Sequence, residues 1–413
     1  MKLLQRVGRD SLWLTAARIG AQVLALFTLL LARRLGNTGF GEYTFVITVI
    51  FIGNVLTTCG TDMYFIREIA GSGDLSRLPA ALWIQLGLSV LFVAGTWTLA
   101  SLVPNQSSAA VLTLKIYSLS LIPMSFYSVF TTALRGMQWM AWVALLNLAG
   151  AVLQALVVLL FLAGVADGLV TLAILLLAAQ VILALLAGWM CSRQISEFWR
   201  NWALSWPDVC AVFAASAVLG ALGLLGMFYQ KAGLLLLSTL GGAALTGLYS
   251  SALRVVEAAK LVHLAALTAL YPRMAQSESA GVVQLSFRLL LAWALALAVG
   301  LSLLAAPVVN LLYGTAFAPA TPVLRILAWA LVPYTVSAFL SLAFVASHRP
   351  RAVGWALTVS LIGLGFFSLC WIPTYGLIGA AWATLSAEIL QAFVLLIQIN
   401  ISGDRHLIIE TVL

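Results

Sequence analysis

Residues 35–43 read LGNTGFGEY, and residues 240–249 read LGGAALTGLY. The two stretches share a Leu-Gly pair, a later glycine and a tyrosine, about 206 positions apart. The same spacing relates Arg67, which precedes an Ile-Ala pair, to Arg273, which precedes a Met-Ala pair. Further along, the Pro123 region matches the Pro333 region at a spacing of about 210. The second half of the chain is therefore predicted to be a diverged copy of the first.

The composition places this duplicated chain in a membrane. Hydrophobic residues make up 63% of the chain and charged residues 8%, and the mean hydropathy is +1.08. Soluble domains carry roughly 25% charged residues. The four cysteines are scattered and have neither paired nor metal-ligand spacing, so no disulfide, metal site or cofactor is predicted. The composition predicts a multi-pass membrane protein.

Long apolar runs define the expected spans, because a helix needs about 20 mainly apolar residues to cross a bilayer. Twelve runs meet this condition: 11–35, 39–66, 79–103, 109–134, 140–163, 168–191, 207–239, 245–272, 286–312, 321–346, 351–373 and 375–400. Six spans in each copy mean that both copies insert in the same orientation. The sequence thus predicts an all-α protein of two parallel six-helix bundles around a central cavity. The expected domains are 1–191, an interfacial cytoplasmic linker at 192–206, and 207–413.

The short loops predict the orientation, since cytoplasmic loops are enriched in Lys and Arg. With the N-terminus in the cytoplasm, twelve basic residues fall on the cytoplasmic side and only Arg33 and Arg34 fall on the other. An even number of spans then places the C-terminus in the cytoplasm as well. The external connections are short and nearly uncharged, so no extramembrane domain is expected.

Seven basic residues remain inside the expected spans: Arg18, Lys115, Lys231, Arg254, Lys260, Arg288 and Arg325. Four acids share the spans: Glu42, Asp62, Glu257 and Glu388. A charge at mid-span costs about 2.5 to 3.5 kcal/mol on insertion scales, so such residues normally face a wet cavity or a partner. The basic excess predicts a cavity that suits an anionic ligand.

One helix face combines three of these charges. Arg254, Glu257 and Lys260 recur at helical spacing, and Glu257 could pair with either basic neighbour. An internal ion pair without a substrate role therefore remains open. Lys231 has no acid within one helical turn, which makes it the strongest phosphate candidate, with placement at the membrane interface as the alternative. His263 lies at the edge of this face or beyond it and is expected to be packed.

Several short motifs together resemble the polysaccharide biosynthesis and oligosaccharide flippase family of the multidrug, oligosaccharidyl-lipid and polysaccharide exporter superfamily. They are Ala32-Arg33-Arg34-Leu35-Gly36, Gly39-Phe40-Gly41-Glu42-Tyr43, Arg67-Glu68-Ile69-Ala70, Tyr229-Gln230-Lys231-Ala232, Leu270-Tyr271-Pro272-Arg273 and Tyr375-Gly376-Leu377-Ile378-Gly379-Ala380-Ala381. Their order and spacing extend over nearly the whole chain.

This resemblance implies a bacterial inner-membrane flippase that moves a polyprenyl-pyrophosphate-linked oligosaccharide by alternating access for surface polysaccharide assembly. It implies no enzyme activity and no nucleic-acid partner, and it suggests the bilayer, a polysaccharide polymerase and other assembly proteins as partners. The implied cavity is lined by the spans at 11–35, 39–66, 207–239 and 245–272. These spans place Arg18, Lys231, Arg254 and Lys260 as pyrophosphate ligands and Glu257 and Asp62 as coupling or ion-pair residues. The family motif more often has an acid where this chain has Lys231, which favours a phosphate contact there.

Two other functions remain as alternatives. An ion-coupled exporter of cationic drugs would need a cavity dominated by acids, and the charge here has the opposite sign. A membrane-embedded glycan polymerase or ligase would need exposed catalytic groups, usually on a sizeable external loop. The external connections of this chain are too short for such a loop.

Overall fold

The computed structural model describes residues 27–164, 168–195, 205–275, 280–347 and 349–401. Within these ranges the chain forms helices joined by short turns, and it contains no strand. The predicted all-α fold is confirmed. The helices and their bounds are α2 (Phe27–Thr58), α3 (Thr61–Ser72), α4 (Leu78–Leu99), α5 (Ser108–Ser118), α6 (Leu121–Gly136), α7 (Met140–Leu162), α8 (Leu169–Gln194), α9 (Trp206–Gly241), α10 (Ala243–Ala275), α11 (Ala280–Leu303), α12 (Ala305–Tyr313), α13 (Thr321–Trp329), α14 (Leu331–Ala346) and α15 (Pro350–Ile401), with short 3₁₀ turns at Ala100–Leu102 and Thr315–Ala320.

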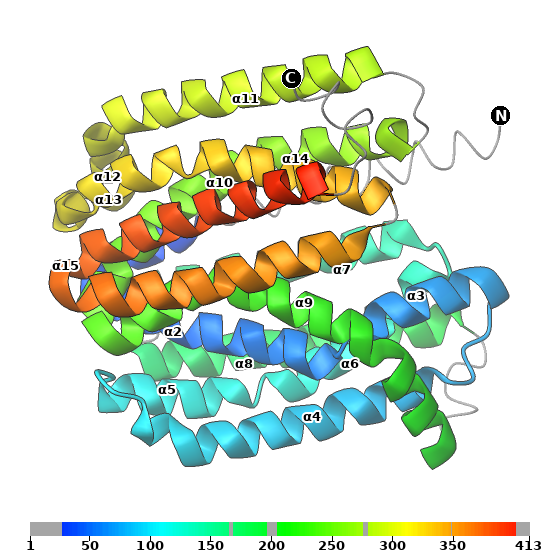
Figure 1. Ribbon diagram of the computed structural model, residues 1–413. Coiled ribbons are helices and arrows are strands. Elements are labelled where there is room, and N and C mark those ends of the chain that lie inside the picture. The colour runs from blue at the N-terminus through cyan, green and yellow to red at the C-terminus, as the bar shows by residue number, and fades with distance from the viewer. Residues whose placement is uncertain (1–26, 165–167, 196–204, 276–279, 348, 402–413) are drawn as a thin grey trace. The chain divides into compact units, whose positions relative to one another are not determined.

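Two of these helices contain a sharp turn at a glycine. Gly36 within α2 has φ 69° and ψ −178°, and Gly376 within α15 has φ 53° and ψ −124°. Glycine adopts positive φ without the steric cost that a side chain adds. The turn at Gly376 separates the predicted spans 351–373 and 375–400, and the two arms of α15 lie side by side in Figure 1. Each of these elements therefore contains parts of two predicted spans.

Two other predicted spans are each broken in the middle, at equivalent positions of the two copies. The run at 109–134 is divided into α5 and α6, and the run at 321–346 is divided into α13 and α14. Pro123 and Pro333 each occupy the third residue of the second piece. A proline is tolerated in the first turn of a helix, where its missing N–H would have no intrahelical acceptor. The break is thus a property of the repeated unit.

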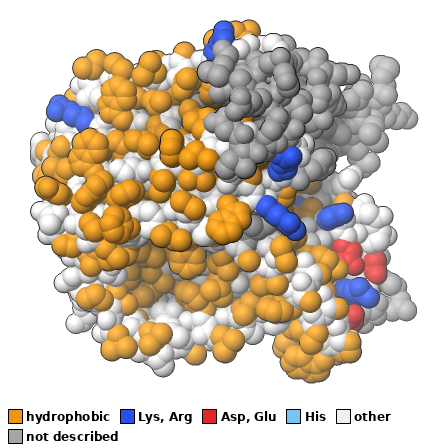
Figure 2. Space-filling model, in the orientation of Figure 1, with side chains coloured by type: hydrophobic (Ala, Val, Ile, Leu, Met, Phe, Trp, Pro, Cys, Tyr) orange, Lys and Arg blue, Asp and Glu red, His pale blue; other side chains and the backbone are white. Residues whose placement is uncertain are grey.

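Nine helical segments in the described part of the chain are long and apolar enough to cross a membrane. Helix α10 is not among them, and it contains Arg254, Glu257 and Lys260. Figure 2 shows a face on which hydrophobic side chains predominate and charged side chains are few. The chain is a multi-pass membrane protein, while the predicted count of twelve spans remains a prediction.

The contacts divide the chain into two compact units. Unit 1 comprises Met1–Leu35 and Val46–Met227, and unit 2 comprises Gly36–Phe45 and Phe228–Leu413. The start of the second expected span therefore belongs to unit 2, and most of the first half of α9 belongs to unit 1. The predicted bundles at 1–191 and 207–413 and the linker at 192–206 remain predictions. Most of that linker lies outside the described residues.

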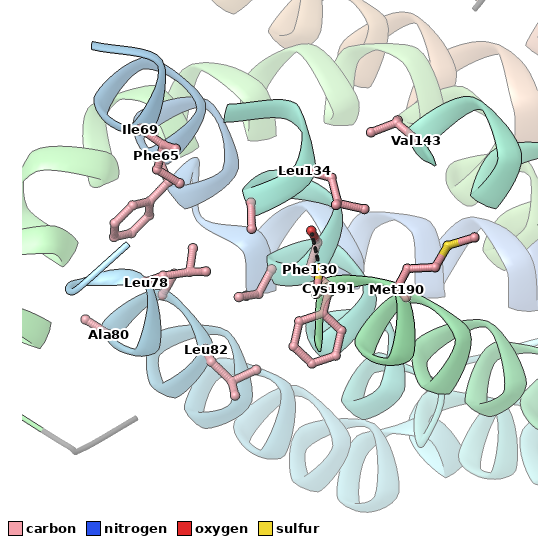
Figure 3. Packing of buried hydrophobic residues seen from close by; sticks show 14 of the residues in the cluster. Phe65, Ile69, Leu78, Ala80, Leu82, Phe130, Leu134, Val143, Met190 and Cys191 are labelled. Atoms are coloured by element: carbon pink, nitrogen blue, oxygen red, sulfur yellow. Dashed lines mark hydrogen bonds between the residues drawn. The ribbon is translucent and has the colours of Figure 1, made fainter. Parts of the chain in front are cut away.

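The core of unit 1 lies between α3, α4, α6 and α8, as Figure 3 shows. Phe65 and Ile69 of α3 are each 1% exposed, and they belong to the same buried cluster as Leu78 of α4 and Phe130 of α6. The thiol of Cys191 lies 3.4 Å from the carbonyl oxygen of Phe130, to which it donates a hydrogen bond. This cluster fixes α3, although α3 has only 12 residues.

The core of unit 2 joins α10, α11, α14 and the two arms of α15. The rings of Phe287 in α11 and Phe339 in α14 have centroids 4.5 Å apart. Leu270 of α10 and Leu395 of α15 belong to the same buried cluster. Because α10 and α15 pack into one core, charged side chains on their facing surfaces can meet within unit 2.

Unit 2 also contains a close contact between equivalent residues of the two copies. A Cβ atom on Gly41 would overlap the carbonyl oxygen of Ala243, and a Cβ atom on Gly247 would overlap that of Asn37. Positions 37 and 243, and positions 41 and 247, are each separated by the repeat spacing of 206. We call these four residues the glycine contact. Small residues of this kind allow close helix packing in membranes, with Cα–H···O contacts between backbones.

Candidate functional site

Unit 2 brings together five ionisable side chains from three helices. They are Lys231 of α9, Arg254, Glu257 and Lys260 of α10, and Glu388 of α15. Ion pairs join Lys231 to Glu257 and Lys260 to Glu388. Three positive and two negative side chains leave an excess of one positive charge. We call this set the charged cluster.

Lys231 has an acidic partner that the local sequence did not reveal. Its Nζ atom donates a hydrogen bond to Oε1 of Glu257 at 3.0 Å. The Lys231 side chain is 20% exposed, whereas that of Glu257 is 44% exposed. The expectation of an isolated ammonium on α9 was therefore wrong, because the acid comes from the adjacent helix. The partner of Glu257 thus lies on another helix, whereas the sequence had suggested its neighbours on α10.

The second pair is more deeply buried. Nζ of Lys260 donates a hydrogen bond to Oε1 of Glu388 at 3.1 Å, and the Glu388 side chain is only 7% exposed. The same ammonium lies 3.9 Å from the centroid of the Tyr334 ring in α14, a favourable cation–π distance. Glu388 Oε2 and the Tyr229 hydroxyl are both buried, and the hydroxyl lies beside the Glu388 carboxylate and interacts with it. The Glu388 carboxylate thus has polar neighbours on two helices, Lys260 on α10 and Tyr229 on α9.

Arg254 is held above an aromatic cluster. Its guanidinium carbon lies 5.1 Å from the centroid of the Phe40 ring, which is fully buried. Phe40 in turn packs against Tyr313 and Phe317, with ring centroids 6.3 and 6.0 Å away. An arginine that stacks on an aromatic face gains a favourable cation–π interaction. This packing fixes the position of the Arg254 guanidinium group.

The other residues considered from the sequence are described separately from this cluster. Arg18 lies outside the described residues. Asp62 is half-buried in the first turn of α3, in unit 1. His263 is fully buried and contacts Tyr334 edge to face, with ring centroids 6.5 Å apart. His263 is therefore packed, as predicted.

Sequence reasoning missed the roles of Glu388, Phe40 and Tyr334. Glu388 was recognised as an acid within a span, but its partner Lys260 is 128 residues away in the chain. Phe40 is separated from Arg254 by most of the first copy. No local spacing predicts contacts at such separations. The only sequence signal for Glu388 was the rarity of an acid inside a span.

The sequence matches the model of a protein family described as "Polysaccharide biosynthesis protein" over residues 7–278. This range covers more than half of the chain. The chain belongs to the polysaccharide biosynthesis protein family. A comparison with curated proteins found no match. The resemblance noted from the motifs is confirmed.

Solved structures of transporters share the fold of this family member. The lipid II flippase MurJ in an inward closed conformation aligns with a TM-score of 0.77 and 15% identity, covering 94% of this chain and 87% of MurJ. A multidrug resistance MATE family transporter in an inward-facing conformation aligns with a TM-score of 0.74 and 17% identity, covering 92% of this chain and 94% of that transporter. A transporter of the MOP superfamily from Pyrococcus furiosus, described as having a binding pocket of reverse polarity, aligns with a TM-score of 0.65 and 16% identity. The alignment covers 97% of this chain and 96% of that transporter.

The family model thus assigns the chain to the polysaccharide biosynthesis proteins. The matching solved structures are those of transporters and a flippase. At identities of 15 to 17%, these structures establish the fold of the chain.

Proposed function

We propose that this protein flips a polyprenyl-pyrophosphate-linked oligosaccharide across the bacterial inner membrane by alternating access. The charged cluster of unit 2 would bind the pyrophosphate, and the lipid tail would remain in the bilayer. Arg18, Lys231, Arg254 and Lys260 remain the proposed ligands, with Glu257 and Asp62 as ion-pair or coupling residues. The cargo serves the assembly of a surface polysaccharide.

The observation that supports this proposal most directly is the environment of Arg254. Arg254 lies above the Phe40 ring, in the same unit as the basic side chains of Lys231 and Lys260. A guanidinium group presents a rigid set of donors that matches phosphate oxygens. Three basic side chains in one unit suit an anionic diphosphate.

The sign of the cluster distinguishes this function from drug export. A cationic drug would need acids in excess, and here basic side chains outnumber acids by three to two. The glycan polymerase alternative is tested separately, by incubating the purified protein with lipid-linked repeat units. We expect no polymer to form, and polymer formation would replace the flippase proposal.

The decisive experiment deletes the gene and analyses the lipid-linked sugars by mass spectrometry. We expect an oligosaccharide intermediate to accumulate on the cytoplasmic side, with the loss of surface glycan. Complementation with Arg254→Gln should leave most of the intermediate trapped, because the fixed phosphate contact is lost. Full export by a normally expressed Arg254→Gln variant would contradict the assignment of Arg254 to the substrate site.

Arg325→Gln provides a matched control for this experiment. Arg325 is also a basic residue on a helix of unit 2, but its side chain is exposed. We expect this variant to export normally. If both variants lose export equally, the effect reflects a general need for positive charge on these helices and not a phosphate site.

The proposed orientation places both termini in the cytoplasm. Fusion of a fluorescent protein that folds only in the cytoplasm should give signal at either terminus. Fusion of alkaline phosphatase, which is active only after export, should give activity near Arg33 and none near Arg193. Phosphatase activity at either terminus would reverse the proposed orientation.

A further inference from the structure

The Lys260–Glu388 pair lies midway along α10 and midway along the second arm of α15. Lys260 is near the centre of α10, and Glu388 lies about halfway between the turn at Gly376 and the end of α15 at Ile401. A buried ion pair contributes little net stability, because desolvation of both ions offsets their attraction. The retention of such a pair in the interior therefore points to a use beyond stability.

The surroundings of Glu388 favour a change of partner. One carboxylate oxygen accepts the hydrogen bond from Lys260, while the other is buried, and the Tyr229 hydroxyl lies beside the carboxylate. A hydroxyl group can donate to a charged carboxylate and can accept from a protonated one. Lys260 is 22% exposed, so its ammonium group can be reached from outside the pair. The ring of Tyr334 would continue to stabilise the ammonium group after the carboxylate has left.

The ionisable groups around Glu388 come from each helix that packs against it. Tyr229 belongs to α9, Tyr249 and Lys260 to α10, and Tyr334 to α14. Helix α13 also packs against α15, but its Arg325 has an exposed side chain. The Tyr249 hydroxyl is already bonded to Thr384 at 2.7 Å. In the described part of the chain Lys260 forms the ion pair with Glu388, whereas Lys231 of α9 pairs with Glu257. The loss of Lys260 to another anion would leave Glu388 as an uncompensated buried charge.

We propose, building on the flippase function above, that a phosphate group of the cargo replaces Glu388 as the partner of Lys260, and that Glu388 then binds one proton. The proton comes from water and forms an O–H bond on the carboxylate, while Lys260 keeps its three N–H bonds throughout. When the cargo leaves, the proton returns to water and the ion pair forms again. The empty transporter then has no unpaired charge at this position, which lowers the cost of changing its conformation within hydrocarbon.

The test measures proton uptake when cargo binds. Full-length protein in nanodiscs is titrated with a short-chain prenyl diphospho-N-acetylglucosamine, whose diphosphate diester does not titrate near neutral pH. Isothermal titration calorimetry in two buffers of different ionisation enthalpy gives the number of protons bound. We expect the wild type to take up as much as one proton per probe, and its affinity to fall by at most about tenfold per unit of rising pH.

Three variants locate the proton. Glu388→Gln should bind the probe with little or no proton uptake and with an affinity that no longer depends on pH. The double variant Glu388→Gln with Lys260→Gln removes both charges, so neither is left buried without a counter-ion and the protein should still fold. This variant should bind the probe weakly and without proton uptake. Asp208→Asn, at the surface pair with Arg77, should behave as the wild type.

Each contrary result has a distinct meaning. Binding of the probe by the wild type without proton uptake would overturn this inference and leave the flippase proposal standing. Proton uptake that persists in Glu388→Gln, or that is abolished by Glu257→Gln instead, would also overturn it. Failure of the wild-type protein to bind the probe at all would contradict the flippase proposal itself.

Discussion

The three ion pairs described for this chain differ mainly in burial. Lys260 and Glu388 have side chains 22% and 7% exposed, and Lys231 and Glu257 have 20% and 44%. Arg77 and Asp208, in unit 1, are 51% and 36% exposed, with Nε and Oδ1 3.3 Å apart. Water can solvate a carboxylate left behind in the exposed pair but not Glu388. The cost of losing the basic partner should therefore rise with burial.

We accordingly expect a graded series of stabilities. Lys260→Ala should destabilise the protein by about 3 to 5 kcal/mol, because it leaves Glu388 buried without a counter-ion. Arg77→Ala should cost at most about 1 kcal/mol, as is usual for exposed pairs, and Lys231→Ala should fall between them. The measurement is the apparent melting temperature in detergent. Restoration by the exchanged pair Lys260→Glu with Glu388→Lys would confirm the cause, and equal losses in all three single variants would contradict it.

The second prediction at this scale concerns the ring beneath Arg254. Phe40→Leu keeps an apolar side chain in the core but removes the aromatic face under the guanidinium group, which contributes on the order of 1 kcal/mol. We expect reduced glycan export, because Arg254 is no longer held in position. Phe317→Leu is the matched control, since Phe317 is equally buried in the same aromatic cluster. Equal export by the two variants would show that only general packing was affected.

At the scale of helices, glycines and prolines decide where the chain turns and how closely it packs. Gly36 and Gly376 supply positive φ at the turns within α2 and α15. Pro123 and Pro333 start the second pieces of two broken spans. Gly41 and Gly247 have a different structural role, because they allow helical backbones to approach each other directly. The same residue type thus has two physical roles that a substitution can separate.

The glycine contact predicts that Gly41→Ala and Gly247→Ala will each destabilise the protein by about 1 to 3 kcal/mol, the usual cost of overpacking. The added methyl group would overlap the Ala243 or the Asn37 carbonyl oxygen. Gly87→Ala is the control, because a Cβ atom there meets nothing within 4 Å. Melting temperatures in detergent test the prediction. A Gly41→Ala variant as stable as Gly87→Ala would mean that the helices separate at little cost.

At the scale of the whole molecule, the duplication supplies two copies of one helical unit, and equivalent residues of the copies meet. The hydroxyl groups of Thr44 and Ser250, again separated by the repeat spacing, lie 3.4 Å apart beside the glycine contact. Alternating access requires the copies to change their mutual contacts during transport. A contact between equivalent residues is a natural place for such a change.

A cross-link tests whether this contact opens. The four native cysteines are first replaced, and Thr44→Cys and Ser250→Cys are then introduced and oxidised. We expect the disulfide to block glycan export and a reductant to restore it. Ser89→Cys with Ser125→Cys is the matched control, because these hydroxyl groups lie 2.9 Å apart between two helices of unit 1. Export that continues with Thr44 and Ser250 cross-linked would show that this contact stays closed during transport.

The sequence by itself determined the class of fold, the duplication and the family. Hydropathy along the chain is a local property, and it revealed the membrane helices without knowledge of their packing. The turns at Gly36 and Gly376 lie at or near boundaries between predicted spans, whereas the breaks before Pro123 and Pro333 divide two spans that were predicted whole. These features depend on backbone geometry, which is encoded within a few residues.

Only the tertiary structure decided which charges neutralise one another. Along the chain, Lys231 had no nearby acid and Glu257 had two basic neighbours, yet these two residues pair with each other. Lys260 finds Glu388 across 128 residues, and Arg254 lies above a ring from the other copy. Electrostatic energy depends on distance in space and on burial, neither of which follows from sequence spacing. The sequence therefore located the charges, and the packing of the helices determined their partners.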